Sequence, residues 1–186
     1  MNSNFCVLDL EATCDDKGTV SRDDMEIIEI GALAFNEELK VIGVYESFIK
    51  PQISPILTPF CTELTTITQE QVDNANTIDI VFKEFNEWLN LNSITKWGSW
   101  GMYDKNQFVK DANRFNIYNP MDNRYHINIK DRFSKVNNMK KQVGLGKACR
   151  IKNLEFQGTA HRALSDTNNI FNIIKNDINL ASNLLK

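Results

Sequence analysis

FCVLDLEATC, from Phe5 to Cys14, is the stretch of sequence that decides the fold. It has the apolar pattern of a short buried strand, which two carboxylates, Asp9 and Glu11, interrupt. Because residues two apart on a strand point to the same face, both carboxylates enter one site, about 7 Å apart. A chain avoids burying carboxylates unless their charge is compensated. Either this strand end is solvated, or hard divalent cations bind there.

The composition indicates one soluble globular domain over residues 1–186. The chain is 42% hydrophobic and 24% charged, and no apolar run approaches the roughly 20 residues that span a bilayer. The N-terminus lacks the pattern of a signal peptide, so we expect a cytoplasmic protein without a membrane partner. The four cysteines show neither a C-x-x-C pair nor zinc-site spacing, and we expect free thiols that serve as small packing residues.

The charge is distributed unevenly along the chain. Residues 1–129 carry 10 Lys and Arg against 20 Asp and Glu, whereas residues 130–186 carry 11 against 4. The acidic part suits a protein that concentrates metal cations and argues against general coating of duplex nucleic acid. The basic segment around residues 130–152 is either a phosphate-binding surface or an ordinary solvated one.

The hydrophobic pattern predicts an α/β fold with a mixed central sheet. We expect strands over residues 5–10, 26–35, 41–51, 95–101 and 126–133. We expect helices over residues 68–75, 79–91 and 104–115, and a last helix whose inward face runs from Leu164 to Ile178. Thr68 and Gln71 have the spacing of a capping box, and the proline-rich residues 51–60 are expected to form an extended loop.

Two further acids and a histidine are candidates for the same site. Asp104 follows a predicted strand and begins a helix, where it is either a cap or a ligand. Asp166 borders the inward face of the last helix. His161 precedes it by five residues, so it can lean over the site only from the loop before that helix. The one other histidine is His126. Four converging carboxylates would hold two Mg²⁺ ions about 3.5–4 Å apart.

These residues resemble the motifs of the DEDD superfamily of 3′-to-5′ exonucleases, in its DEDDh branch. The motifs are VLDLEATC, WGSWGMYDKNQF and AHRALSDTNNI, the last with the histidine-plus-five interval of that branch. EIIEIGALAF and FIKPQISPILTPFCTELTTITQEQVDNA are similar to the Eri-type and KapD-like group. The likeness covers roughly residues 5–175. It implies an RNase H-like fold with a mixed five-stranded sheet flanked by helices.

The resemblance also implies how the site residues act. Asp9 would bridge two Mg²⁺ or Mn²⁺ ions, Glu11 and Asp166 would hold one, and Asp104 would bind the other mainly through water. His161 would be the general base. The sequence departs from the family pattern in three places, at Thr66, Ala163 and Ser165. None of these replaces a ligand or the base, so we expect activity to survive.

The implied substrate is a single-stranded RNA or an RNA 3′ end, and the implied product is a nucleoside 5′-monophosphate. The residues expected to contact substrate are Glu11, Ala12, Thr13, Ile67, Tyr103 and His161. The backbone at Ala12 and Thr13 would contact the terminal sugar hydroxyls, and Ile67 and Tyr103 would pack on the base. Core packing is the alternative for these last two.

Three other functions remain open. A DNA-directed exonuclease of the proofreading or repair type would use the same residues on another substrate. A catalytically silent regulator of the same fold would bind RNA or protein without cutting. A metal-storage or structural protein has only the acid count in its favour.

Overall fold

The computed structural model describes residues 4–185, and its centre is a five-stranded sheet in the order β3-β2-β1-β4-β5. The strands are β1 (Asn4–Ala12), β2 (Ile27–Phe35), β3 (Val41–Phe48), β4 (Ile94–Ser99) and β5 (Tyr125–Asn128). β1 pairs antiparallel with β2 and parallel with β4, and β5 extends the parallel side. The predicted mixed five-stranded sheet is therefore confirmed.

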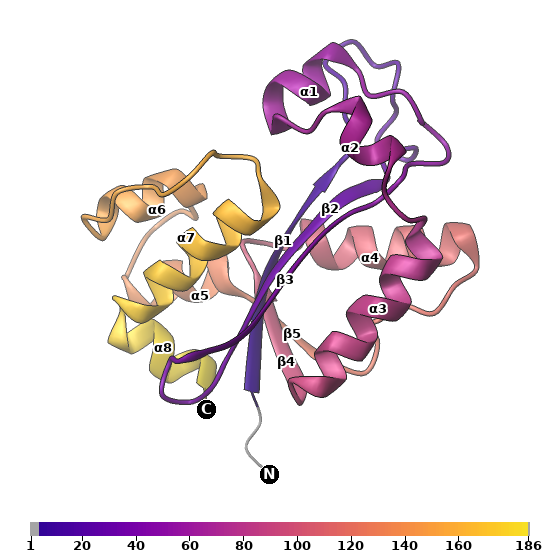
Figure 1. Cartoon of the computed structure of the whole chain (residues 1–186). Helices are drawn as coiled ribbons and strands as arrows, with labels where there is room; N and C mark the ends of the chain where they lie inside the picture. Colours follow the sequence, from indigo (N-terminus) through magenta and orange to yellow (C-terminus); the bar gives the residue numbers. More distant parts are fainter. Residues whose placement is uncertain (1–3, 186) are drawn as a thin grey trace.

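Helices cover both faces of this sheet (Figure 1). They are α1 (Pro59–Thr65), α2 (Gln69–Asp73), α3 (Ile78–Leu91), α4 (Tyr103–Phe115), α5 (Ile129–Val136), α6 (Leu145–Ile151), α7 (Ala163–Lys175) and α8 (Ile178–Leu185). α3 and α4 lie on one side, α5 to α8 lie on the other, and α1 and α2 sit beyond the carboxyl end of β1. No helix within residues 4–185 is long and apolar enough to cross a membrane.

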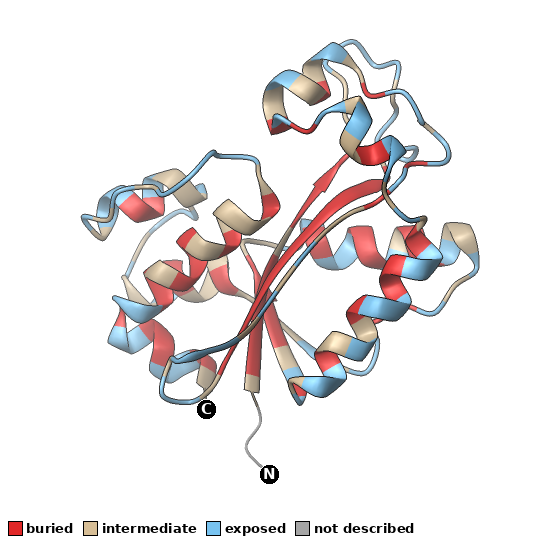
Figure 2. Cartoon of the chain, viewed as in Figure 1, coloured by how far each residue is buried: buried red, intermediate tan, exposed pale blue. Residues whose placement is uncertain are grey.

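Alternate side chains of β1 belong to two separate hydrophobic cores. Cys6, Leu8 and Leu10 belong to the apolar cluster formed with α3 and α4, whereas Phe5 and Val7 belong to the cluster formed with α5, α7 and α8. Figure 2 shows β1 and β2 as the most continuously buried part of the chain. The period of two then continues the Phe5 and Val7 face to Asp9 and Glu11. The second core therefore ends in carboxylates.

Three predicted elements differ from the structure in their bounds. Residues 51–60 do not form a loop throughout, because Thr58 caps α1 by accepting a hydrogen bond from the Cys61 N–H at 3.0 Å, and Pro59 occupies the first turn. The strand predicted over 126–133 ends at Asn128, whose side chain caps α5. The last helix is broken at Asp177, so Ile178 begins α8 and is 80% exposed rather than inward-facing.

The backbone conformation at Thr66 shows why a glycine is expected at this position of the family pattern. Thr66 follows α1 with φ 60° and ψ 8°, in the left-handed region, and its N–H donates to the Thr62 carbonyl. A glycine adopts this conformation without steric cost, whereas a β-branched residue is strained in it. The glycine expected at this position is thus a helix-capping residue, which is consistent with a change there leaving the acidic cluster intact.

Candidate functional site

The site is built on the carboxyl end of β1. In the pairing of β1 with β2, Asp9 lies opposite Gly31 and Glu11 lies opposite Glu29. The register shifts just after Glu11, and this irregularity ends the regular ladder at the site. Asp9 is half-buried and Glu11 is buried, so the end of this strand is not the solvated face that the sequence left open.

Helix α7 brings the third motif to this strand end by lying directly against β2. A Cβ at Gly31 would collide with the backbone of Ala163 and Leu164, so only glycine permits this approach. The Thr167 hydroxyl donates to the Gly31 carbonyl at 2.8 Å and fixes the contact. Ala163 is fully buried, and its small side chain suits this close packing. The first turn of α7 is thereby held over β1 and β2.

Glu29 anchors the segment that precedes α7. It has no exposed surface, and its carboxylate accepts hydrogen bonds from the Arg162 guanidinium at 2.7 Å and from the Ala163 N–H at 2.8 Å. Arg162 also lies 5.3 Å from the centre of the Phe48 ring. Sequence reasoning missed Glu29, although a single carboxylate inside the apolar EIIEIGALAF gives the same signal that identified Asp9 and Glu11.

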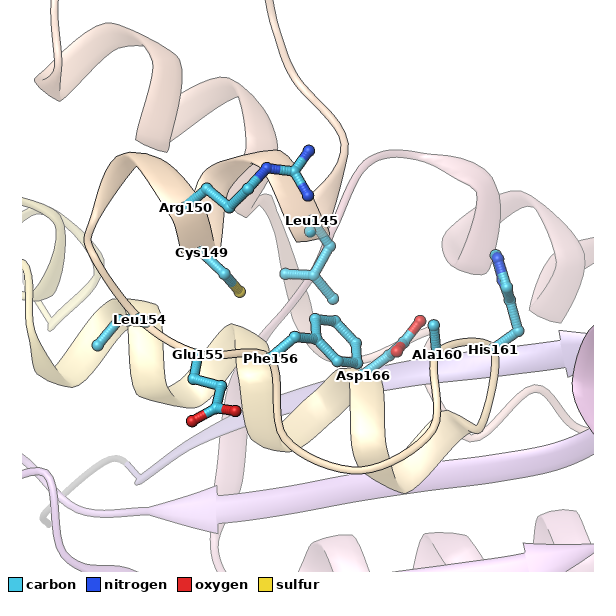
Figure 3. Close-up of a pocket in the computed structure, with 10 residues that line it drawn as sticks. Leu145, Cys149, Arg150, Leu154, Glu155, Phe156, Ala160, His161 and Asp166 are labelled. Carbon is cyan, nitrogen blue, oxygen red and sulfur yellow. The ribbon is translucent and has the colours of Figure 1, made fainter.

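His161 and Asp166 meet Glu11 at this place. One ligand atom from each of the three side chains lies within 4.8 Å of the other two. His161 lies in the loop before α7 with φ 60°, a left-handed conformation that histidine tolerates better than most residues, and it is exposed. Figure 3 shows His161 and Asp166 along one edge of a pocket. The loop position predicted for His161 is confirmed.

Asp104 approaches from the opposite side of the sheet. It occupies the first turn of α4, is 4% exposed, and accepts a hydrogen bond from the Leu10 N–H at 3.2 Å. This bond ties α4 to β1 between the two strand carboxylates. The capping alternative is not what the structure shows, because Met102 precedes the helix and Asp104 lies inside it.

The acidic groups raise one another's pKa. Burial, followed by the negative charges of Asp104, Glu11 and Asp166, raises the pKa of Asp9 well above its ordinary value. Burial and the nearby acids raise the pKa of Glu11 to about 9. Burial also raises the pKa of Asp104 and that of Asp166 to about 6. Without positive counter-charge, this cluster resists full ionisation at neutral pH.

The cluster fits divalent cations. The Oδ1 atom of Asp166 is buried and has no hydrogen-bond partner among the described residues, although buried polar atoms normally have one. Its neighbours offer carboxylate oxygens, the donors that Mg²⁺ and Mn²⁺ prefer. A bound cation would satisfy this oxygen and offset the mutual repulsion of the acids.

The residues predicted to contact substrate differ in their exposure and in their hydrogen bonds. Tyr103 is 46% exposed beside Asp104, whereas Ile67 is fully buried in a cluster with Ile28 and Val72, which favours core packing. The Thr13 N–H already donates to the Glu26 carbonyl at 2.8 Å. The Ala12 carbonyl receives a weak hydrogen bond from the Cys61 thiol. Contact between these backbone groups and a sugar stays a prediction.

His126 and the cysteines serve the scaffold. Burial lowers the pKa of His126 to about 4, its Nε2 lies 3.1 Å from the Ser99 hydroxyl, and its ring packs on Trp97. It is therefore not part of the acidic cluster. All four cysteines are free; Cys14 is half-buried and the others are buried, as the sequence predicts.

Comparisons with known proteins agree with this geometry. The model of the exonuclease family RNase_T matches residues 6–174. The human protein "3'-5' exoribonuclease 1" is 30% identical over 179 residues, which cover 91% of this chain and 50% of that protein. The human "ERI1 exoribonuclease 3" is 31% identical over 192 residues. The chain spans about half the length of the curated relatives it matches.

A solved structure repeats the fold. The nuclease domain of 3'hExo, described as a DEDDh family member bound to rAMP, superposes with a TM-score of 0.85 at 26% identity, covering 92% of this chain and 90% of that one. The mixed five-stranded sheet and the flanking helices predicted from the sequence thus recur in an experimentally determined nuclease domain.

Proposed function

The chain belongs to the RNase T family of exonucleases and to its DEDDh branch, and on this premise we propose that it is a metal-dependent 3′-to-5′ exoribonuclease. The observation that carries the proposal is the convergence of Glu11, His161 and Asp166 within 4.8 Å, with a buried Asp166 oxygen that has no hydrogen-bond partner in the described part of the chain. The cluster lies at the carboxyl end of the central strand β1, and His161 and Asp166 border the pocket in Figure 3.

The residues of the cluster have different proposed roles in the reaction. Asp9, Glu11, Asp104 and Asp166 hold two divalent cations, Mg²⁺ or Mn²⁺. When bound, the cations supply an activated water and stabilise the charge that builds on the leaving 3′ oxygen. His161 is exposed at the rim, where its imidazole would take a proton from the attacking water as general base. Glu29 positions His161 indirectly, by holding Arg162 and the start of α7.

RNA is the substrate that the relatives favour. Two of them carry the name exoribonuclease, and a further similar structure, with a TM-score of 0.85 at 25% identity, concerns recognition of a histone mRNA stem-loop by a 3′-exonuclease. In this chain Tyr103 is exposed next to Asp104, which supports a role for its ring in stacking on the terminal base. Cleavage there releases a nucleoside 5′-monophosphate and shortens the strand from its 3′ end.

Time-resolved digestion of a 5′-labelled single-stranded RNA tests the proposal. With Mg²⁺ or Mn²⁺ the label should pass through a ladder that shortens by one nucleotide at a time, and EDTA should abolish it. A deoxyribo-oligonucleotide of the same sequence should be cut more slowly. Equal or faster cutting of the DNA would reassign the substrate. RNA binding with no mononucleotide released under any metal would instead identify a silent regulator.

A further inference from the structure

The cavity shown in Figure 3 lies directly beside the acidic cluster. It has a volume of about 660 Å³, within the roughly 300–1,000 Å³ typical of small-molecule sites. His161 and Asp166 form one edge, and the other walls come from α6 and the segment between α6 and α7. Tyr103, which the proposed function assigns to the terminal base, does not line it, and neither does Ala12, whose backbone the resemblance assigns to the terminal sugar.

The walls of this cavity offer an apolar surface and a cation, which suit the base and the phosphate of a nucleotide. Leu145 and Phe156 are half-buried members of the apolar cluster on this face, and in Figure 3 both side chains project into the cavity. Arg150 is exposed on α6, and its guanidinium lies at the rim. The one carboxylate on the rim besides Asp166, that of Glu155, points away from Arg150. An apolar surface for a base thus lies next to a cation for a phosphate.

The cations of α6 are available, unlike others in the same basic segment. Lys135 pairs with Asp131 and Lys152 pairs with Asp177, each at 2.7 Å. Within residues 4–185, neither Arg150 nor Lys147 forms an ion pair. Lys147 lies three residues before Arg150 and therefore faces the same side of the helix. The sequence left open whether this basic segment binds phosphate. Other cations of the segment also lack an ion pair within the described residues, so the place of Arg150 on the cavity wall, and not pairing alone, distinguishes it.

We infer that this cavity is the subsite for the nucleotide on the 5′ side of the scissile bond, with Phe156 against its base and Arg150 on the phosphate that follows upstream. The inference rests on the proposed function, since it places the leaving nucleotide relative to the cluster. The terminal nucleotide occupies the Tyr103 side, the scissile phosphate lies at Glu11 and Asp166, and the strand leaves along α6. Arg150 and Phe156 are then positioning and specificity residues for polynucleotide substrates.

Two substrates separate this subsite from the reaction centre. The p-nitrophenyl ester of uridine 5′-monophosphate has the terminal nucleotide and a scissile ester but no upstream nucleotide, whereas a 12-nucleotide RNA has both. Arg150→Gln should lower kcat/KM on the RNA about 10-fold, the scale of one lost charged contact, with a much smaller change on the ester. Phe156→Leu, which keeps apolar volume but removes the ring, should show the same asymmetry. Lys175→Gln, which removes an exposed cation from the far end of α7, is the matched control.

Binding gives a second readout that does not depend on turnover. In EDTA, the affinity of the labelled RNA should fall with salt, and Arg150→Gln should reduce the slope of log affinity against log salt by about 0.7, the value for one phosphate contact on a single strand. Lys175→Gln should leave the slope unchanged.

The outcomes separate the two proposals. Equal losses on both substrates, or no loss on the RNA, would overturn the subsite while leaving the exonuclease assignment intact. A wild-type protein that hydrolyses neither substrate with Mg²⁺ or Mn²⁺ would overturn the proposed function, and the subsite with it.

Discussion

Two groups of buried carboxylates lie within the same sheet and its helices, and they differ in their partners. Glu26, Glu29 and Asp111 are at most 2% exposed, yet each accepts several hydrogen bonds. Glu26 receives three backbone N–H groups at 2.7–2.8 Å, and Asp111 receives the Ile27 N–H and the Gln107 amide. Around Asp9, Glu11 and Asp166 the nearby charges are mostly negative, and within residues 4–185 one Asp166 oxygen has no hydrogen-bond partner.

The difference teaches that burial alone does not identify a functional acid. A buried carboxylate that receives its full set of donors holds the scaffold together, and the structure supplies those donors from the backbone. A cluster that lacks them is costly to ionise and is retained for a ligand that the chain itself does not provide. Counting donors thus separates the two groups where sequence pattern cannot.

Removing the proposed base should give the largest effect. His161→Ala should lower kcat on RNA by about 10²–10⁴-fold, the usual contribution of a general base, and should flatten the acid limb of the pH–rate profile. His126→Phe keeps the ring on Trp97 and cannot be protonated, so it should change kcat less than about twofold, because His126 lies outside the cluster. An acid limb that persists in His161→Ala would remove that residue from the role.

Neutralising a carboxylate in the group of Asp9, Glu11 and Asp166, which lacks a full set of hydrogen-bond donors, should abolish most activity without harming the fold. Asp166→Asn should lower kcat by about 10²–10³-fold, the scale of losing one charge-stabilising group. Its free energy of unfolding in EDTA at pH 7.5 should equal or exceed that of the wild type, because a repulsive charge is gone. Full activity, or a marked loss of stability in urea unfolding, would place Asp166 with the scaffold acids instead.

A change in the group of Glu26, Glu29 and Asp111, whose carboxylates have their hydrogen-bond donors, should instead reduce stability. Glu29→Gln should lower the free energy of unfolding by about 2–3 kcal/mol, somewhat below the cost of breaking a fully buried pair, because Arg162 keeps contact with solvent and with Glu46 at 3.7 Å. Glu46→Gln, at the exposed end of the same arginine, should cost less than about 1 kcal/mol. Urea unfolding measures both. Equal losses for the two variants would contradict the assignment of Glu29 as the anchor.

The sequence contained enough to predict the sheet and most of the site. The period-two apolar runs define the central strands, and the carboxylates that break them mark the site, because these signals are local. The helices α5 and α6 and the break before α8 were not predicted. Their causes are tertiary or fall on short segments: the Asn128 cap, the Lys152–Asp177 ion pair and the Asp177 side chain that accepts the Leu180 N–H.

Other parts of the site depend on contacts that no spacing reveals. The close packing of α7 on Gly31, the pairing of Glu11 opposite Glu29 and the lack of an ion pair at Arg150 among the described residues all follow from how distant segments meet. Tyr103 and Ile67 illustrate the same limit, since one is exposed and the other fully buried although both were predicted to pack on a base.

The smallest effect is the pH dependence of stability without metal, and it tests the comparison directly. The folded-state pKa of Asp166 is raised to about 6, so its stabilising contribution is complete below its ordinary pKa of about 4 and is lost as the pH rises through about 6. In EDTA, the wild type should therefore lose about 1–2 kcal/mol more than Asp166→Asn between pH 4 and pH 7, measured by urea unfolding. Added Mn²⁺ at pH 7.5 should restore the wild type and not the variant, since only the wild type retains the full acidic cluster. If the two proteins instead gave parallel curves of stability against pH, Asp166 would carry no excess repulsion. The two groups of carboxylates would then not differ in stability as their hydrogen-bond partners indicate.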